Sequence, residues 1–138
     1  MKLAGQYLLP GSPEKVWELL TDSERLAKFL PGCERLDPDG PDRYKAAIKS
    51  GTGTIEFAEK NPPQSVLMKL SGKAILGSID ASVRIDLAGN DGQTDLRYSG
   101  DLQVGGMMAA VGERMIEGTV MKAMDQLFAS VADELKKA

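Results

Sequence analysis

The side chains that could do chemistry in this sequence are few, and the types that are missing exclude several reaction classes. The 138 residues contain no histidine and one cysteine, Cys33. Common zinc sites, Ser-His and Cys-His nucleophile pairs and most histidine acid–base mechanisms are therefore excluded. Cys33 lacks the base that usually activates a thiol, so we expect a small buried thiol there. The sequence predicts no metal site, no catalytic residue and no cofactor.

The carboxylates and the one glycine-rich segment have structural explanations. Four aspartates alternate with apolar residues and lie close in sequence to arginines, a pattern typical of ion pairs on the solvated face of a sheet. These aspartates are Asp80, Asp86, Asp95 and Asp101. The segment 50–54, SGTGT, resembles a phosphate-binding loop, but the required lysine and a following helix are both missing. We expect a hairpin turn at 50–53 instead.

An apolar surface with a few polar groups is the remaining candidate site. Gly77, Ala81 and Gly100 lie in the apolar phase of the predicted strands. Small residues there either leave room beside the sheet or mark a strand bend. Tyr44 and Tyr98 share this phase and could orient a mostly apolar ligand, although a buried tyrosine can equally bond to the backbone. A ligand cavity and a filled core both remain open at this point.

The order of the elements that carry these residues follows from hydrophobic periodicity. Residues 2–9 alternate and predict a strand, while Ser12 and Pro13 predict the start of a helix to about residue 21. A second short helix should end before Pro31. From Cys33 to Val104 the period is two, which predicts an antiparallel meander of about six strands. The expected turns are 37–42, 50–53, 61–64, 72–73 and 89–92.

A long amphipathic helix is predicted over residues 107–135. Its apolar residues recur every three or four positions. Gly112 and Gly118 lie within it, together with five of the seven methionines of the chain. Each glycine costs about 1 kcal/mol relative to alanine in a helix. The two glycines are either close-packing points in a core, or they belong with the methionines to an adaptable wall of a cavity.

Composition and charge narrow the class of protein. The length and the hydrophobic content of 42% predict a single α+β domain over residues 1–138. Seventeen basic and twenty acidic residues give a net charge of −3, and no basic stripe with interleaved aromatics is present, so nucleic acid is not an expected partner. The start of the chain is too mixed for a signal peptide, no run suits a membrane span, and a lone cysteine fits a reducing compartment. We expect a cytoplasmic protein.

Two segments of the chain resemble the CoxG family of carbon monoxide dehydrogenase subunits. They are residues 10–22 (PGSPEKVWELLTD) with the following 30–34 (LPGCE), and residues 105–114 (GGMMAAVGER). This family lies within the START-like superfamily of polyketide cyclases and Bet v 1-like proteins. The resemblance implies a helix-grip fold in the order β-α-α-β6-α. In this fold a curved antiparallel sheet of about seven strands wraps around a long C-terminal helix, with an apolar tunnel between them.

The resemblance also implies a function. The superfamily binds lipids, quinones and other hydrophobic molecules, and the family is associated with recruitment of molybdenum-containing carbon monoxide dehydrogenases to the cytoplasmic membrane. We therefore expect a non-enzymatic accessory protein that binds a lipid or quinone. It would assist membrane recruitment or maturation of such a hydroxylase, in the cytoplasm or at the inner face of the cytoplasmic membrane. The expected cavity-lining residues are Trp17, Phe29, Tyr44, Phe57, Met68, Leu70, Ile79, Ala81, Val83, Leu96, Tyr98, Met107, Met108, Val111 and Met115.

Two alternatives remain beside this expectation. A small cyclase or hydrolase-like enzyme of the same superfamily would need Tyr44, Tyr98 or an inward carboxylate as acid or base. The strand phase contains no inward carboxylate. An interaction module with a filled core would instead pack tightly around Ala81 and Gly100.

Overall fold

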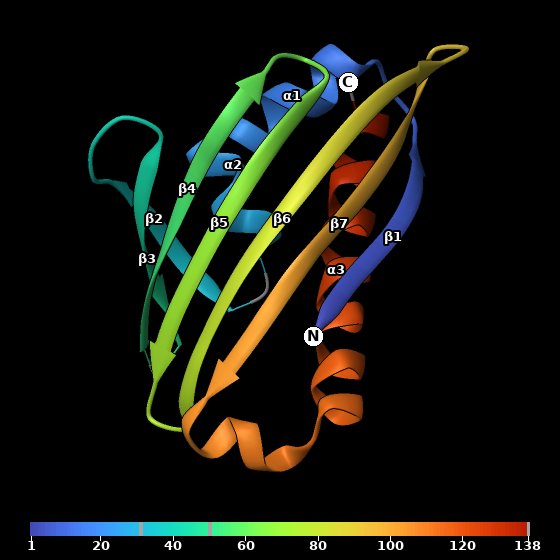
Figure 1. Ribbon diagram of the computed structural model, residues 1–138. Helices are drawn as coiled ribbons and strands as arrows, with labels where there is room; N and C mark the ends of the chain where they lie inside the picture. The colour runs from blue at the N-terminus through green and yellow to red at the C-terminus, as the bar shows by residue number, and fades with distance from the viewer. Residues whose placement is uncertain (31, 50, 138) are drawn as a thin grey trace.

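A seven-stranded antiparallel sheet with helices on one side forms the protein (Figure 1). The computed structural model describes residues 1–30, 32–49 and 51–137. The elements in chain order are β1 (Lys2–Leu9), α1 (Pro13–Thr21), α2 (Ser23–Phe29), β2 (Cys33–Pro38), β3 (Arg43–Ile48), β4 (Gly51–Asn61), β5 (Ser65–Ala74), β6 (Gly77–Asn90), β7 (Gln93–Gly105), the 3-10 helix η1 (Gly106–Val111) and α3 (Glu113–Lys136). The strands lie in the order β1-β7-β6-β5-β4-β3-β2, so α1 and α2 carry the chain from one edge to the other. This order confirms the predicted α+β helix-grip architecture.

Two of the predicted turns are wrong, because their glycines lie inside strands. Gly51 and Gly53 belong to β4, and Gly72 belongs to β5, whose hairpin with β6 turns at Ile75 and Leu76 instead. Ser50 lies outside the described residues, whereas the predicted end of the second helix before Pro31 is confirmed, since α2 ends at Phe29. A Cβ atom on Gly53 would stand 2.6 Å from the carbonyl oxygen of Ser71 in the neighbouring strand. Glycine is present there because another backbone approaches closely.

Glycines of this kind also explain how the sheet bends. A Cβ atom on Gly51 in β4, or on Gly100 in β7, would collide with a carbonyl oxygen of the adjacent strand. Glycine kinks and register shifts are the usual sources of sheet curvature. The pairing of β4 with β5 shifts register between Ala58 and Asn61, and that of β2 with β3 between Cys33 and Arg35. The apolar face of the sheet thus becomes concave toward the helices.

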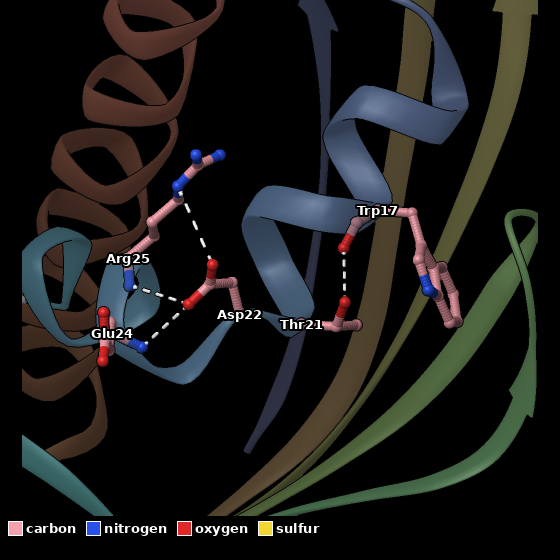
Figure 2. A network of polar contacts seen from close by, with 5 residues as sticks. All are labelled: Trp17, Thr21, Asp22, Glu24 and Arg25. Atoms are coloured by element: carbon pink, nitrogen blue, oxygen red, sulfur yellow. Dashed lines mark hydrogen bonds and ion pairs between the residues drawn. The ribbon is translucent and has the colours of Figure 1, made fainter.

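The corner between α1 and α2 is held by polar contacts around Asp22 (Figure 2). One carboxylate oxygen of Asp22 accepts hydrogen bonds from the backbone N–H groups of Glu24 and Arg25, at 3.0 and 3.3 Å, and so caps α2. At the end of α1, the Thr21 hydroxyl donates to the carbonyl of Trp17 at 2.7 Å, while the Trp17 indole points away from this network. The corner fixes how the apolar sides of both helices meet the sheet.

The predicted helix over 107–135 is wrong in its first part. The chain forms η1, breaks at Gly112 with φ 101° and ψ 144°, and begins α3 at Glu113. Side chains rarely allow such a backbone conformation, so glycine decides where the long helix starts. Met107 and Met108 therefore lie outside α3. The reading of Gly112 and Gly118 as close-packing points is also wrong, because a Cβ atom at either position would have no neighbour within 4 Å.

The hydrophobic core lies between the concave face of the sheet, the helices α1 and α2, and the second half of α3. The second half of α3 contributes Leu127, Phe128, Val131 and Leu135, which are all buried. From the first helices, Val16 and Leu26 are fully covered. The first turns of α3 extend past the beginning of β1 (Figure 1) and contribute no buried residue. The core is thus concentrated toward one end of the molecule.

Candidate ligand-binding site

Three aromatic rings fill the space between the strands β1 and β7 and the second half of α3. The ring centroids of Tyr7, Tyr98 and Phe128 lie 4.5 to 6.1 Å apart. Tyr98 and Phe128 are 2% and 1% exposed. Gly5, which pairs with Tyr98 across the strands, leaves room for the ring, since a Cβ atom there would stand 2.5 Å from it. This aromatic cluster closes one end of the space between sheet and helix.

The hydroxyls of the cluster are donors. The Tyr7 hydroxyl donates to the carboxylate of Asp125, and the Tyr98 hydroxyl to the sulfur of Met121 at 3.5 Å. Burial raises the pKa of Tyr7, and the hydrogen bond to Asp125 raises it further. Burial also raises the pKa of Tyr98. Both hydroxyls keep their protons at neutral pH, so they can donate a hydrogen bond but are poor general bases.

Toward the η1 end, the same face of the sheet is less well covered. Along β6 the inward residues Ile85 and Val83 are buried, whereas Ala81 and Ile79 are half-buried. The opposite wall changes in the same direction: Phe128 is buried in α3, whereas Val120 and Ile116 are half-buried and Met115 is 65% exposed. Sheet and helix therefore separate toward η1, and apolar side chains line both walls.

A groove of about 430 Å³ lies where η1 and the start of α3 approach β7. It is lined by Met1, Leu102, Gln103, Val104, Ala109, Glu113 and Ile116. Leu102, Val104 and Ile116 give it apolar walls, and the polar side chains of Gln103 and Glu113 are exposed. Its surface is mixed polar and apolar, and its volume is in the range of small-molecule sites.

The structure places the predicted lining residues in three groups. Phe29, Phe57, Met68, Val83, Leu96 and Tyr98 are buried in the core. Trp17, Tyr44, Leu70, Ile79, Ala81 and Met108 are half-buried. Met107, Val111 and Met115 are 70%, 52% and 65% exposed. Of the predicted set, Leu70, Ile79 and Ala81 stand on the less covered part of the sheet. A role for them in lining a ligand cavity stays a prediction.

None of the seven groove residues was among the predicted lining residues, and three of the seven could have been found from the sequence. Leu102 and Val104 continue the alternation of Leu96 and Tyr98 along β7, and Ile116 belongs to the apolar stripe of α3. The alternation was a sufficient signal for the two strand residues. The sequence pattern did not show the break at Gly112, which directs η1 across the end of the sheet and so creates the groove.

Other candidate chemistry is weak in the described part of the chain. No three histidine, cysteine, aspartate or glutamate side chains there are grouped so that they could hold a metal ion. None of the helices described here combines the length and the apolar character that crossing a membrane requires. Cys33 is half-buried and not buried as expected. Its burial raises the pKa of the thiol, which keeps the thiol protonated at neutral pH.

Comparison with known proteins decides the family. The profile of CoxG, a family of carbon monoxide dehydrogenase subunits, matches residues 5–136. The chain belongs to the CoxG family. Apart from Met1, all the groove residues and the whole of η1 lie inside the matched range. No curated protein matches this CoxG-family chain at a significant level.

Solved structures show that the CoxG-family chain has a START-type fold. A conserved protein from Geobacillus kaustophilus is 32% identical, with a TM-score of 0.96 and coverage of 99% of this chain and 96% of that one. A START superfamily protein from Mycobacterium smegmatis has a TM-score of 0.81 at 11% identity, with coverage of 99% and 97%. The Zhui aromatase/cyclase from Streptomyces sp. R1128 has a TM-score of 0.77 at 15% identity, with coverage of 99% and 94%. At 11% and 15% identity the likeness establishes the fold alone.

Proposed function

We propose that this CoxG-family protein binds a hydrophobic ligand, a lipid or a quinone, between the sheet and the first half of α3. The proposal rests on one observation: the apolar side chains of β6 and of α3, which face each other, both become less buried toward η1. Ala81 and Ile79 on β6, and Val120 and Ile116 on α3, are half-buried at the same end of the molecule. Apolar surface on two facing walls gains free energy when an apolar molecule covers it, at about 25 cal/mol per Å².

The acidic side chain at the groove favours a ligand with an uncharged polar end. Glu113 places a negative charge at the rim of the groove, whereas Gln103 alternates with the inward Leu102 and Val104 and so directs its amide to the outer face of β7. A carboxylate or phosphate would be repelled by Glu113, whereas the carbonyl of a quinone or a neutral lipid would not. We therefore favour an uncharged amphipathic molecule with its apolar part directed toward Ala81.

The proposed role is non-enzymatic. The enzyme alternative needs a base at the apolar face, and Tyr98 has its pKa raised by burial. The similarity to an aromatase/cyclase at 15% identity supports the fold but brings no catalytic residue to this chain. Membership of the CoxG family supports an accessory role beside a molybdenum-containing carbon monoxide dehydrogenase-type enzyme.

An exposed apolar end supports the membrane part of this role. We call Ile75, Leu76, Met107 and Val111 the apolar tip; they are 87%, 60%, 70% and 52% exposed. The hairpin of β5 and β6 carries the first two, and η1 carries the others. A lipid surface would cover such side chains favourably. The proposed protein would therefore exchange its ligand at the inner face of the cytoplasmic membrane.

Native mass spectrometry of the freshly purified protein tests ligand binding. We expect a stoichiometric adduct that is lost on denaturation and recovered as a hydrophobic molecule by organic extraction. Ala81→Leu should abolish the adduct with little loss of stability, because its side chain fills the space that the ligand occupies. Ala88→Leu, on the outer face of the same strand, is the matched control and should keep the adduct. Equal loading of the two variants would contradict the proposed position.

A separate experiment tests the partner. The tagged protein should recover a molybdenum-containing hydroxylase from cells that express both proteins. A second assay tests the membrane contact: the double variant Ile75→Ser, Met107→Ser should sediment less with liposomes than the unchanged protein. Failure to recover any such enzyme would count against the accessory role while leaving ligand binding intact.

A further inference from the structure

The segment η1 is attached weakly to the rest of the protein. None of its residues is buried, and Met107 and Val111 are 70% and 52% exposed. The Met108 backbone N–H donates to the carbonyl of Leu76 at 2.9 Å, which docks η1 on the hairpin of β5 and β6. The Met108 side chain lies against Gly77, where a Cβ atom would stand 3.1 Å from Cγ of the methionine. Undocking η1 therefore breaks few contacts and exposes little additional apolar surface.

Glycines in unusual conformations stand at both ends of η1. Gly106 has φ 70° at its start, and Gly112 has φ 101° just after its end. No atom lies within 4 Å of the place where a Cβ of Gly112 would stand, so this glycine serves the backbone conformation and not close packing. The helix α3 then begins without a side-chain cap at Gly112. Gly112 thus has the properties of a hinge, because little fixes the backbone there, whereas Gly106 lies against β6, where its Cβ would stand 2.9 Å from the Cα of Gly77.

The position of η1 decides what its movement would uncover. It crosses the end of the sheet between β7 and α3, at the bottom of Figure 1. The groove with Val104 and Ile116 runs beside it, and the half-buried Ile79 lies on the strand that follows the docking hairpin. Displacement of η1 would widen the path from this groove to the apolar walls.

We propose that η1 is a lid that swings on a glycine hinge at Gly112 and admits the hydrophobic ligand between the sheet and α3. In the docked state, the hydrogen bond from Met108 to Leu76 closes the path. In the undocked state, the ligand enters or leaves at the end of the sheet. This inference rests on the proposed function, since a lid needs a ligand to admit.

A disulfide across the docking contact tests the lid. Leu76→Cys with Met108→Cys, in a Cys33→Ser background, would hold η1 docked when oxidised. Uptake of decylubiquinone is followed by stopped-flow quenching of Trp17, the one tryptophan of the chain. We expect uptake by the oxidised protein to be about tenfold slower than by the reduced protein, with no effect of oxidation on either single cysteine variant.

The outcomes separate the lid from the proposed function. A disulfide verified by mass, with uptake as fast as in the reduced protein, would overturn the lid while leaving ligand binding in place. If the reduced protein gives no quenching and retains no native adduct, ligand binding itself is overturned, and the lid with it.

Hinge variants provide a second test that needs no cross-link. Gly112→Ala disfavours the docked conformation, because alanine rarely adopts φ 101°. Both uptake and release of decylubiquinone should then become faster, opposite to the effect of the disulfide. Gly118→Ala is the matched control, since it also adds a methyl group where no neighbour lies within 4 Å, but inside α3. Equal rates in the two alanine variants would contradict a hinge at Gly112.

Discussion

The two halves of α3 have similar apolar stripes but different surroundings. In the second half, Phe128 and Val131 are 1% and 0% exposed and pack against β1, α1 and α2. In the first half, Ile116 and Val120 are half-buried, and Met115 is 65% exposed. One half is a structural support, and the other leaves its apolar side chains partly uncovered. An amphipathic pattern therefore shows which side of a helix is apolar, but the elements opposite decide how much of it is covered.

The same contrast holds for the polar groups near the helix. Beside the second half, the hydroxyls of Tyr7 and Tyr98 find partners in Asp125 and Met121. Beside the first half, Gln103 and Glu113 line an open groove. Polar groups in the closed part stabilise the fold, whereas those of the open part are exposed.

The largest expected difference between the halves is in stability. Phe128→Ala should lower the free energy of unfolding by about 3–5 kcal/mol, since it removes a buried ring that touches both tyrosines. Met115→Ala, in the exposed half, should change it by about 0.5 kcal/mol or less. Urea denaturation followed by circular dichroism measures both values. Similar losses of unfolding free energy for the two variants would show that the two halves of α3 are equally well packed.

Adding volume beside the aromatic cluster should also destabilise the protein. Gly5→Ala places a methyl group 2.5 Å from the Tyr98 ring and should cost about 1–3 kcal/mol of unfolding free energy. Tyr98→Leu in the same chain should recover part of the loss, because the smaller side chain makes room. If Gly5→Ala is neutral in urea denaturation, the closed half is less tightly packed than the ring contacts indicate.

The tyrosines of the closed half predict a loss of stability at alkaline pH. Their pKa values are raised in the folded protein above the ordinary value of 10.0. Below pH 10 both tyrosines are protonated in the folded and the unfolded states, so their full contribution is present. Above pH 10 the unfolded state loses these protons first, and stability falls as the pH rises.

Tyr7→Phe isolates this effect. It should cost about 1 kcal/mol at neutral pH through the lost hydrogen bond to Asp125. It should also flatten the decline of unfolding free energy above about pH 10 relative to the wild type. Titration of lysines is common to both proteins and cancels in the comparison. Parallel curves for the two proteins would show that Tyr7 does not contribute to the decline.

The smallest expected effect is a gain in the open half. Gly118→Ala should stabilise the protein by about 0.5–1 kcal/mol, because alanine favours a helix and its methyl group meets no neighbour. Thermal unfolding measures the shift. A loss of stability would show that Gly118 has a packing partner. The first half of α3 would then be more closely packed than its exposed side chains indicate.

Much of the fold could be predicted because its signals are local. Ser12 with Pro13 predicted the start of α1, and the alternation from Ile79 to Leu87 predicted the inner face of β6. The errors arose at glycines. Gly53 and Gly72 were read as turn residues, and Gly112 as a helix residue. Glycine serves turns, close approaches and unusual backbone angles alike, and the sequence does not show which of these applies.

The candidate site was less predictable than the fold. The alternation along β7 correctly placed Leu96 and Tyr98 on the inner face, but it did not show that their end of the sheet is filled by Tyr7 and Phe128. Tyr7 and Phe128 are separated by most of the chain, and no local pattern relates them. Local alternation determines the face of a residue, and long-range packing determines whether space remains beside it.

The sequence by itself determined the order of elements, the apolar face of each, and the absence of histidine chemistry. These properties depend on residue identity and on spacing within one segment. Only the tertiary structure decided which half of α3 is covered, that Gly112 separates η1 from the helix, and that a groove forms beside Val104. Burial is a property of two surfaces that meet, and here those surfaces come from opposite ends of the chain.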